Sequence, residues 1–261
     1  MDILIISLPN AKERRDFQQN QLSKLGLEFE FLDATSIHDL NEATYKKHYQ
    51  DWQRPLKTTE VACYYSHRQA WDRVIQSNKP ALILEDDALL SKCVPTLLKN
   101  PLSRKDADLI NFENRARKKF VSRSGESITC NSKLLRLYQD RTGAAGYILW
   151  PSGAKKLIQC EEKKGIALAD AHITACNNLI AYQVEPSPII QLDHCEYYDI
   201  KNPISNNASD SSVSSHNNPK GGVFFWLRRI YSQVKLGIRQ LFLVTFSTRR
   251  YIKIDKKGFY D

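Results

Sequence analysis

Ala81-Leu82-Ile83-Leu84-Glu85-Asp86-Asp87 runs from four apolar residues directly into three acidic ones. An apolar run of this kind predicts a buried strand of a parallel sheet. Ligands of open α/β folds bind beyond the carboxyl ends of such strands, so the three carboxylates are expected at a binding site. Like charges repel one another and also repel phosphate, which favours a site built around a hard divalent cation. The alternative is that the acids occupy the first turn of a following helix, where the helix dipole favours negative charge.

Apolar and polar segments alternate around this stretch in the manner of an α/β protein. The predicted elements are strands over 2–8, 28–32, 81–84, 107–112, 134–138 and 145–150, and helices over 11–25, 60–77 and from Ser152, as N-cap, to Cys160. Such alternation predicts a mainly parallel sheet that helices cover on both faces. Neither a G-x-G-x-x-G nor a Walker A sequence is present, so the sequence offers no ready phosphate-binding loop.

Several short motifs flank the acidic stretch in a recognisable order. They are Ile5-Ile6-Ser7-Leu8 with Arg14 and Arg15, Phe31-Leu32-Asp33-Ala34, Thr59 to His67 with Trp71, Gly143 to Leu149, Ser152-Gly153-Ala154 and Ala169-Asp170. Over about residues 1 to 195 this series resembles the glycosyltransferase family 25 domain, the family of bacterial lipooligosaccharide galactosyltransferases and collagen galactosyltransferases. The resemblance rests on the combination of Glu60, Ser66-His67 and the three acids. One departure is Thr59, where we would expect Gly.

The resemblance implies both a fold and a reaction. The fold is α/β of GT-A type, with a Rossmann-like, mainly parallel sheet. The reaction is inverting transfer of a hexose from a nucleotide sugar, with UDP-galactose as the expected donor and UDP-glucose as the alternative. The acceptor is the outer core of lipooligosaccharide. A Mn²⁺ or Mg²⁺ ion between the diphosphate oxygens would neutralise the charge that develops as the glycosidic bond breaks.

Individual roles are assigned to residues that match the family pattern. Asp87 is the first choice of metal ligand, with Glu85 and His194 as further candidates. Inversion requires a general base on the acceptor hydroxyl, and Asp170 is the candidate. The residues expected to contact the donor are Leu8, Arg14, Glu60, Ser66, His67, Glu85 and Asp86.

Each of these assignments has a structural alternative. Arg14 suits a charged helix face, and a lone histidine such as His67 on a helix is more often structural. Glu60 suits the positive end of a helix dipole. Asp170 suits the N-cap of a segment over 171–179, a role that is compatible with acting as the base.

The cysteines and the hydropathy pattern indicate a cytoplasmic protein. The six cysteines, at positions 63, 93, 130, 160, 176 and 195, show neither CxxC spacing nor close pairing, so reduced thiols are expected rather than a zinc site or a disulfide framework. The apolar run over 3–6 is too short for a signal peptide, and no run of about 18 apolar residues occurs.

The net charge of +9 is concentrated near the C-terminus. Nine Lys or Arg against two Asp give +7 over 223–261, which leaves +2 for the preceding residues. We expect a glycosyltransferase domain over 1–200, a flexible linker over 201–222 that is rich in Asn and Ser, and a basic amphipathic tail over 223–261.

Basic and apolar residues together predict that the tail forms an interfacial helix. Such a helix would be drawn to anionic lipid, on the inner face of the bacterial inner membrane. The alternative is a helix packed on the catalytic domain or on a partner. No nucleic-acid partner is expected, because no recognised nucleic-acid motif accompanies the charge.

Two other classes of function are compatible with clustered acids. A glycosidase also uses paired carboxylates, but adjacent acids at one strand end are poorly arranged to flank a sugar from opposite faces. A non-catalytic carbohydrate-binding or membrane-docking module would retain the fold without turnover. Metal-dependent binding of uridine diphosphate is expected of a glycosyltransferase or of its non-catalytic relative, but not of a glycosidase. Sugar transfer then distinguishes the glycosyltransferase from the non-catalytic relative.

Overall fold

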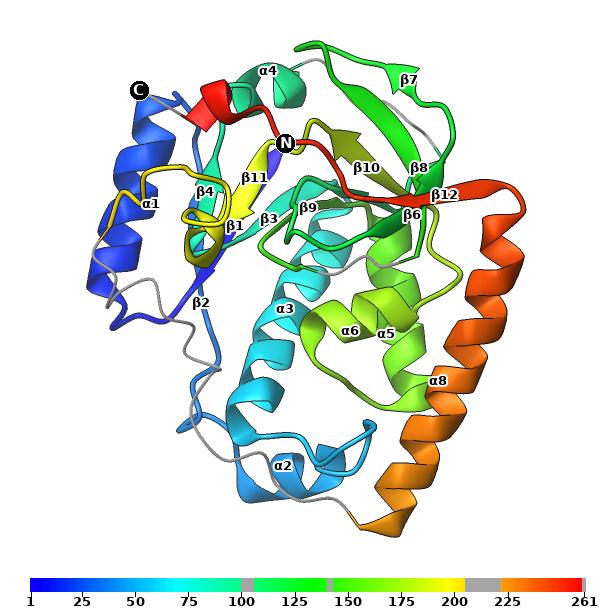
Figure 1. Ribbon diagram of the computed structural model, residues 1–261. Coiled ribbons are helices and arrows are strands. Elements are labelled where there is room, and N and C mark those ends of the chain that lie inside the picture. The colour runs from blue at the N-terminus through cyan, green and yellow to red at the C-terminus, as the bar shows by residue number, and fades with distance from the viewer. Residues whose placement is uncertain (100–105, 140–142, 205–221, 260–261) are drawn as a thin grey trace.

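The computed structural model describes residues 1–99, 106–139, 143–204 and 222–259 (Figure 1). The chain begins with a βαβ unit of β1 (Asp2–Ser7), α1 (Lys12–Lys24) and β2 (Glu30–Asp33), in which the two strands are parallel. The helix ends just before Gly26, whose φ of +65° is one that glycine adopts without strain. The first predicted unit is therefore confirmed.

The remaining elements follow the predicted alternation. They are α2 (Glu42–His48), α3 (Thr58–Ser77), β3 (Ala81–Glu85), β4 (Ala88–Leu90), α4 (Val94–Lys99), β5 (Leu109–Asn111), β6 (Lys119–Ser122), β7 (Glu126–Ser127), β8 (Lys133–Gln139), β9 (Gly146–Leu149), α5 (Pro151–Lys164), α6 (Ala169–Ala175), β10 (Ala181–Glu185), β11 (Ile189–Gln191), a 3-10 turn (Leu192–His194), α8 (Val223–Val244), β12 (Ser247–Arg250) and a last 3-10 turn (Lys256–Phe259).

Among the described residues, ten strands form one mixed sheet in the order β12-β6-β8-β10-β5-β9-β3-β1-β2, with β7 paired to β8. Strands β2 and β3 are parallel to β1, β10 is parallel to β5, and β9 is antiparallel to both β3 and β5. In the part of the sheet with the order β10-β5-β9-β3-β1-β2, every strand except β9 points the same way, and the carboxyl ends of these five strands share one edge. The predicted fold class, an α/β fold with a mainly parallel central sheet and a C-terminal helix, is confirmed.

Helices cover both faces of the sheet because the side chains of each strand alternate between them. On one face, Leu4 of β1 and Trp71 of α3 belong to an apolar cluster that also includes residues of α5 and α6. On the other face, Ile5 of β1 and Leu22 of α1 belong to a second cluster that reaches α4. Figure 1 shows α3, α5 and α6 grouped together, with α1 well apart from them.

A second, two-stranded sheet lies next to the acidic stretch. Strand β4 begins at Ala88, directly after the acids, and pairs antiparallel with β11, so that Ala88 faces Gln191. The N–H of Leu192 also donates to the backbone oxygen of Asp87 at 3.0 Å. This pairing places the chain near residue 190 beside the acids, a contact between distant segments that periodicity does not reveal.

The C-terminal segment is divided between an outer helix and the main sheet. Helix α8 runs along the outside of the molecule (Figure 1), whereas β12 pairs with β6 at the sheet edge and Ile252 is buried in the main core. This differs from the expected single tail over 223–261, because the polar residues of β12 suit a sheet edge. Most of the expected linker, residues 205–221, lies outside the described residues. No described helix is long and apolar enough to cross a membrane.

Two local expectations are corrected. The helix expected from Ser152 begins at Pro151 with Trp150 as its N-cap, because proline favours the first helical turn. Cys93 and Cys130, expected as reduced thiols, form a disulfide with their Cα atoms 6.3 Å apart. They are separated by 37 residues in sequence, and only the fold brings them together.

Candidate active site

A cavity of about 850 Å³ opens beyond the carboxyl ends of β1 and β3. Its walls are the start of α1, the loop after β2, the first turns of α3 and α6, and the acidic stretch. The predicted site residues that line it are Leu8, Arg14, Glu60, Ser66, His67, Glu85, Asp86, Asp87 and Asp170. These predicted residues come from four separate segments of the sequence, and the fold brings them to one cavity.

Asp86 is held by side chains of the first βαβ unit. Ser7 Oγ donates to Asp86 Oδ2 at 2.8 Å, and Arg14 Nη1 donates to Oδ1 at 2.9 Å. The side chains of Arg14 and Asp86 are 15% and 13% exposed, so this ion pair is only slightly screened by water. Arg15 instead donates to the backbone oxygens of Ser7 and Leu8, and so fixes the end of β1.

Asp87 is the buried member of the acidic stretch, at 7% exposure. The side-chain amide nitrogen of Gln191 lies 3.3 and 3.4 Å from its two carboxylate oxygens. Burial and the negative charges of Glu85 and Asp86 raise the pKa of Asp87 to about 7. A bound cation would offset both the burial and the repulsion.

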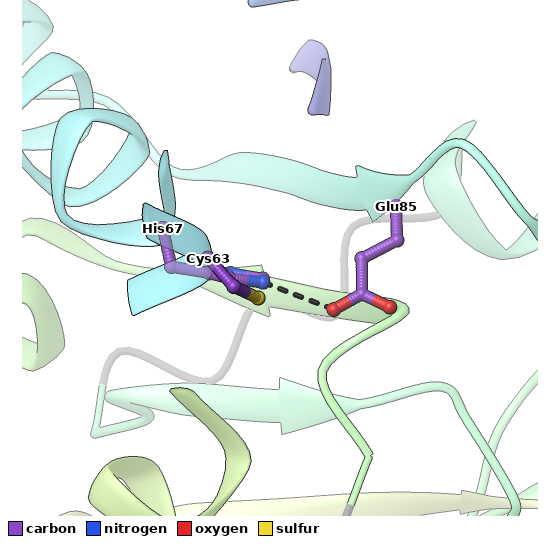
Figure 2. A group of neighbouring side chains, drawn as sticks. All are labelled: Cys63, His67 and Glu85. Carbon is purple, nitrogen blue, oxygen red and sulfur yellow. Dashed lines mark hydrogen bonds and ion pairs between the residues drawn. The ribbon is translucent and has the colours of Figure 1, made fainter. Parts of the chain in front are cut away.

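Glu85 is held at both of its carboxylate oxygens. Gln191 Nε2 donates to Oε2 at 2.9 Å, and Nε2 of the buried His67 lies 3.0 Å from Oε1. The other ring nitrogen of His67 lies 3.0 Å from the hydroxyl of Tyr147 on β9. Figure 2 shows the side chains of His67, Glu85 and Cys63 pointing toward one another. One ligand atom of each lies within 4.8 Å of the other two. Burial and the charge of Glu85 raise the pKa of the Cys63 thiol, which keeps it protonated.

The atoms around Asp87 fit a hard divalent cation such as Mn²⁺ or Mg²⁺. Gln191 Oε1 is buried and has no hydrogen-bond partner in the described part of the chain, although its amide nitrogen contacts both Glu85 and Asp87. Carboxylate and amide oxygens are the ligands that such cations prefer. His194 is not among the lining residues, and its Nδ1 lies 2.6 Å from Oδ1 of Asp193. Asp87, Glu85 and Gln191 are therefore the residues that would hold such a cation.

Glu60 and Ser66 line the cavity, but their side chains are engaged within the protein. Arg54 donates twice to the Glu60 carboxylate, at 2.8 and 2.5 Å, and the N–H of Lys57 donates to it at 2.9 Å. Burial opposes ionisation of Glu60, but these bonds lower its pKa overall. Ser66 Oγ accepts the N–H of Thr35 at 3.0 Å. Both residues thus fix the cavity walls.

Asp170 lies in the first turn of α6 and lines the same cavity. Helix α6 runs from Ala169 to Ala175 with Leu168 as its N-cap, so the expectation that Asp170 caps a helix over 171–179 is wrong. Its Oδ1 accepts the N–H of Ala171 at 2.6 Å. The pKa of Cys63 is raised first by burial, then by the charge of Glu85 and then by the charge of Asp170. Asp170 and Cys63 are therefore close enough to interact electrostatically.

Arg115 and Gln191 are site residues that the sequence analysis missed. Arg115 lines the cavity and donates to Asp193 Oδ2 at 3.0 Å. Glu113-Asn114-Arg115 come directly after the predicted strand over 107–112, much as the acids come at the end of β3. A search for polar residues after each predicted strand would therefore have found Arg115. Gln191 gives no comparable signal, because only the pairing of β4 with β11 brings it to the acids.

Glu113 is a second buried acid that the sequence analysis missed. Its Oε2 accepts the N–H of Ala145 at 2.8 Å, and its Oε1 is buried and without a partner among the described residues. Burial and the charge of Glu85 raise its pKa to about 8. Gly143 has a φ of +92°, and a Cβ atom there would lie within 2.6 Å of the Glu113 carboxylate, so any other residue would be strained and would displace Glu113. Glu113 therefore shapes the wall formed by Gly143 and Ala144.

Similar sequences come from bacteria and from an insect. A Haemophilus influenzae protein named as a glycosyltransferase is 28% identical over 170 residues, which cover 63% of this chain and 59% of the relative, so the match spans about three fifths of that relative's length. The lipooligosaccharide biosynthesis protein lic2B of Haemophilus influenzae is 27% identical over 214 residues, which cover 76% and 78% of the two chains. A glycosyltransferase 25 family member of Aedes aegypti is 26% identical over 185 residues, which cover 66% of this chain and 30% of the insect protein.

Solved structures with some likeness include two glycosyltransferases. One is involved in glycosylation of the major capsid of PBCV-1, with 12% identity, a TM-score of 0.33 and coverage of 64% of this chain and 67% of the other. The second is the galactosyltransferase LgtC in complex with donor and acceptor sugar analogues, with 13% identity, a TM-score of 0.40 and coverage of 70% and 73%.

The sequence profile of one family, described as glycosyltransferase family 25 (LPS biosynthesis protein), matches residues 1–173. The matched region includes the acidic stretch, α3 and Asp170. Because it covers 173 of the 261 residues, this chain belongs to glycosyltransferase family 25.

Proposed function

We propose that this chain is an inverting hexosyltransferase that moves galactose from UDP-galactose onto the outer core of bacterial lipooligosaccharide. The observation that carries the proposal is the unequal environment of the three adjacent acids. Asp86 is paired with Arg14, Glu85 is held by hydrogen bonds, and Asp87 is buried with a pKa of about 7. One acid is thus left to take up a cation while its neighbours stay fixed.

The donor would lie along this acidic edge. The carboxylates of Glu85 and Asp86 can accept hydrogen bonds from sugar hydroxyls through the lone pairs that their protein partners leave open. Arg115 lines the cavity with a guanidinium whose geometry suits phosphate oxygens. Leu8 and Arg14 form the wall at the end of β1, and Glu60, Ser66 and His67 keep the neighbouring wall in place.

Asp87 and Glu85, with Gln191, would hold Mn²⁺ or Mg²⁺, and His194 stays a weaker candidate ligand. When bound, the ion supplies charge neutralisation for the departing diphosphate. The protein residues supply position: Gln191 spans Glu85 and Asp87 and sets the spacing of their carboxylates. Carboxylates held in this way need little rearrangement during the reaction.

Asp170 is proposed as the general base. It lies on α6, separate from the acidic stretch, and lines the same cavity. Single displacement with inversion needs a carboxylate that accepts the proton of the attacking acceptor hydroxyl. The N–H of Ala171 holds Oδ1, which leaves Oδ2 for the acceptor.

We also propose that the chain works on the inner face of the inner membrane, where α8 contacts anionic lipid. The helix carries four basic residues and no acidic one. Most of its large apolar residues are exposed. Those at helical spacing on one side are Val223, Leu227, Ile230, Val234, Ile238 and Leu241, with exposures from 42% to 76%. An apolar stripe on a cationic helix is typical of an interfacial helix.

The test is a donor screen with the purified full-length protein. UDP-galactose and UDP-glucose are compared with Mn²⁺ or with chelator, and with and without lipooligosaccharide. We expect metal-dependent transfer, fastest from UDP-galactose, and an anomeric configuration in the product opposite to that of the donor. Faster transfer from UDP-glucose would overturn the donor assignment, and retention would overturn the mechanism. Metal-dependent UDP binding without transfer would instead indicate the non-catalytic module.

A further inference from the structure

We propose that Trp71, Tyr147 and His67 form a one-way hydrogen-bond relay that positions the carboxylate of Glu85. Trp71 Nε1 lies 2.9 Å from the Tyr147 hydroxyl, the hydroxyl lies 3.0 Å from His67 Nδ1, and His67 Nε2 lies 3.0 Å from Glu85 Oε1. The side chains of Trp71, Tyr147 and His67 are at most 2% exposed, so water does not compete for the two bonds among them. The relay leads from the core to the cavity wall.

The proton positions along the relay follow from what each group can donate. The indole N–H of Trp71 can only donate, so the Tyr147 oxygen accepts from it. Burial raises the pKa of Tyr147, so the phenol keeps its own proton. The structure gives that proton one acceptor within the described residues, Nδ1 of His67. Nδ1 is therefore unprotonated, and the proton of a neutral imidazole is on Nε2, which donates to Glu85.

The opposite proton arrangement leaves a buried donor unpaired. If His67 carried its proton on Nδ1, the Tyr147 oxygen would accept two bonds, and its own proton would have no acceptor among the described residues. An unpaired buried polar group costs about 1–3 kcal/mol. The arrangement with the proton on Nε2 pairs every donor in the relay.

The relay also decides between two uses of the group in Figure 2. Cys63, His67 and Glu85 offer one sulfur, one nitrogen and one oxygen within 4.8 Å, as a transition-metal site would. A metal at this position needs the lone pair of His67 Nε2, but the relay puts a proton there. The group is therefore a positioning device for Glu85, and the cation belongs beside Asp87.

The relay concerns the proposed donor site, and the UDP-binding test below rests on the proposed function. Glu85 is held by His67 at Oε1 and by Gln191 at Oε2, so the carboxylate presents its remaining lone pairs to the cavity in a fixed orientation. A fixed acceptor of this kind selects a ligand that offers hydroxyl groups at the matching position, such as the ribose of a nucleotide sugar. His67 and Tyr147 are thus positioning residues.

The first test needs no enzymatic activity. Long-range ¹H–¹⁵N spectra of the full-length protein, labelled with ¹⁵N-histidine, distinguish a protonated from an unprotonated ring nitrogen, and the spectrum of His67→Gln identifies the signal of His67. We expect a proton on Nε2 and none on Nδ1, as the hydrogen-bond geometry requires. A ring protonated at Nδ1, or at both nitrogens, overturns the relay. So does a Co²⁺ complex with a sulfur-to-metal absorption band that Cys63→Ser removes.

The second test measures coupling to Glu85 with UDP and Mn²⁺ as the probe. Tyr147→Phe removes one hydroxyl and should weaken UDP binding about tenfold, because the bond it supports ends on a charged group. Combined with Glu85→Gln, it should cause no further loss, because both changes act through one carboxylate. Tyr64→Phe is the matched control: it removes a buried hydroxyl from α3 that bonds Glu161, and UDP binding should not change. Additive losses overturn the relay.

The outcomes separate this inference from the proposed function. If wild-type protein binds no UDP but shows His67 protonated at Nε2, the relay stands and the nucleotide-sugar assignment fails. If UDP binds with metal but the ring is protonated at Nδ1, the assignment stands and the relay fails.

Discussion

Asp87 and its two neighbours show how one strand end gives three identical charges different properties. Arg14 and Ser7 compensate Asp86, His67 and Gln191 compensate Glu85, and Asp87 receives only the weaker contacts of one amide. Because the pKa of a carboxyl rises when its charged form is desolvated and repelled, the least compensated acid is the one that titrates near neutral pH. The sequence places the three acids together but does not rank them.

Asp87→Asn should abolish Mn²⁺-dependent UDP binding and nearly all transfer while leaving the protein folded. The substitution removes a charge that its neighbours repel, so the melting temperature of the metal-free protein should not fall. Isothermal titration with UDP and Mn²⁺, alongside thermal unfolding, measures both effects. Asp199→Asn, an exposed acid outside the cavity, is the control. Unchanged metal-dependent binding in Asp87→Asn would refute the metal assignment.

The same acid predicts how the stability of metal-free protein depends on pH. The folded pKa of about 7 lies above the ordinary value of 3.8, so between pH 4 and 7 the native protein binds a proton that the unfolded chain has lost. The stabilising contribution of Asp87 is therefore present below pH 4 and is lost as pH rises to 7. Denaturant unfolding of wild type and Asp87→Asn from pH 4.5 to 8 should show the wild type losing stability relative to the variant. Glu113 shifts in the same direction but is common to both proteins, and parallel curves would contradict the raised pKa.

Asp170→Asn should separate chemistry from binding. A general base acts in the transition state and contributes about 10² to 10⁴-fold, so kcat should fall by that range while UDP affinity stays near wild type. Asparagine keeps an oxygen for the N–H of Ala171, so stability should change little. Steady-state kinetics with a soluble acceptor, beside UDP titration, checks the split. A wild-type kcat would leave Asp170 with a structural role alone.

At the scale of elements, local patterns predicted the sheet core but not the contacts between distant segments. The strands at 2–8 and 81–84 were found because continuous apolar runs ending in turn or acidic residues are typical of buried parallel strands. β12 was missed because Ser247–Arg250 is polar and becomes a strand only through its pairing with β6. Gln191 and the disulfide between Cys93 and Cys130 were missed for the same physical reason: each depends on tertiary contact.

The loop before β9 offers a test of the cavity wall. Gly143 has a φ of +92°, and an added Cβ would lie 2.2 Å from the Glu113 carboxylate, so Gly143→Ala should lower the free energy of unfolding by about 1–3 kcal/mol and weaken UDP binding. Gly237→Ala in the exposed α8 is the control: its Cβ meets open space, so stability should rise by up to about 1 kcal/mol. Denaturant unfolding measures both variants. Equal behaviour of the two would show that Glu113 does not constrain this loop.

At the scale of the whole molecule, α8 is attached at its inner side to the main sheet and to the segment after α2, and it is exposed at its outer side. Arg228 donates to the backbone oxygens of Gln50 and Trp52, Arg239 donates to that of Tyr138, and Leu243 is buried. The remaining two basic residues of the helix, Arg229 and Lys235, are exposed. Cutting the chain before α8 would also remove β12 and the buried Ile252, so truncation confounds lipid binding with folding.

Substitution on the outer face of α8 avoids that difficulty and tests the membrane proposal directly. The triple variant Ile230→Ser, Val234→Ser, Ile238→Ser changes residues that are 42%, 56% and 65% exposed, so the protein should stay folded and keep its activity on a soluble acceptor. Flotation with anionic vesicles should fall sharply, because the variant lacks the three apolar side chains that would be buried in the lipid interface.

The double variant Arg229→Gln, Lys235→Gln should weaken flotation mainly at low salt. Each cation contributes about 1 kcal/mol to binding, and salt screens this attraction within a Debye length of about 8 Å. Tyr251→Ser, an exposed aromatic residue outside α8, should float like wild type. If the triple variant floats like wild type but dissociates from a dimer to a monomer in size-exclusion chromatography with light scattering, the apolar face binds a second copy of the chain and the membrane proposal is wrong.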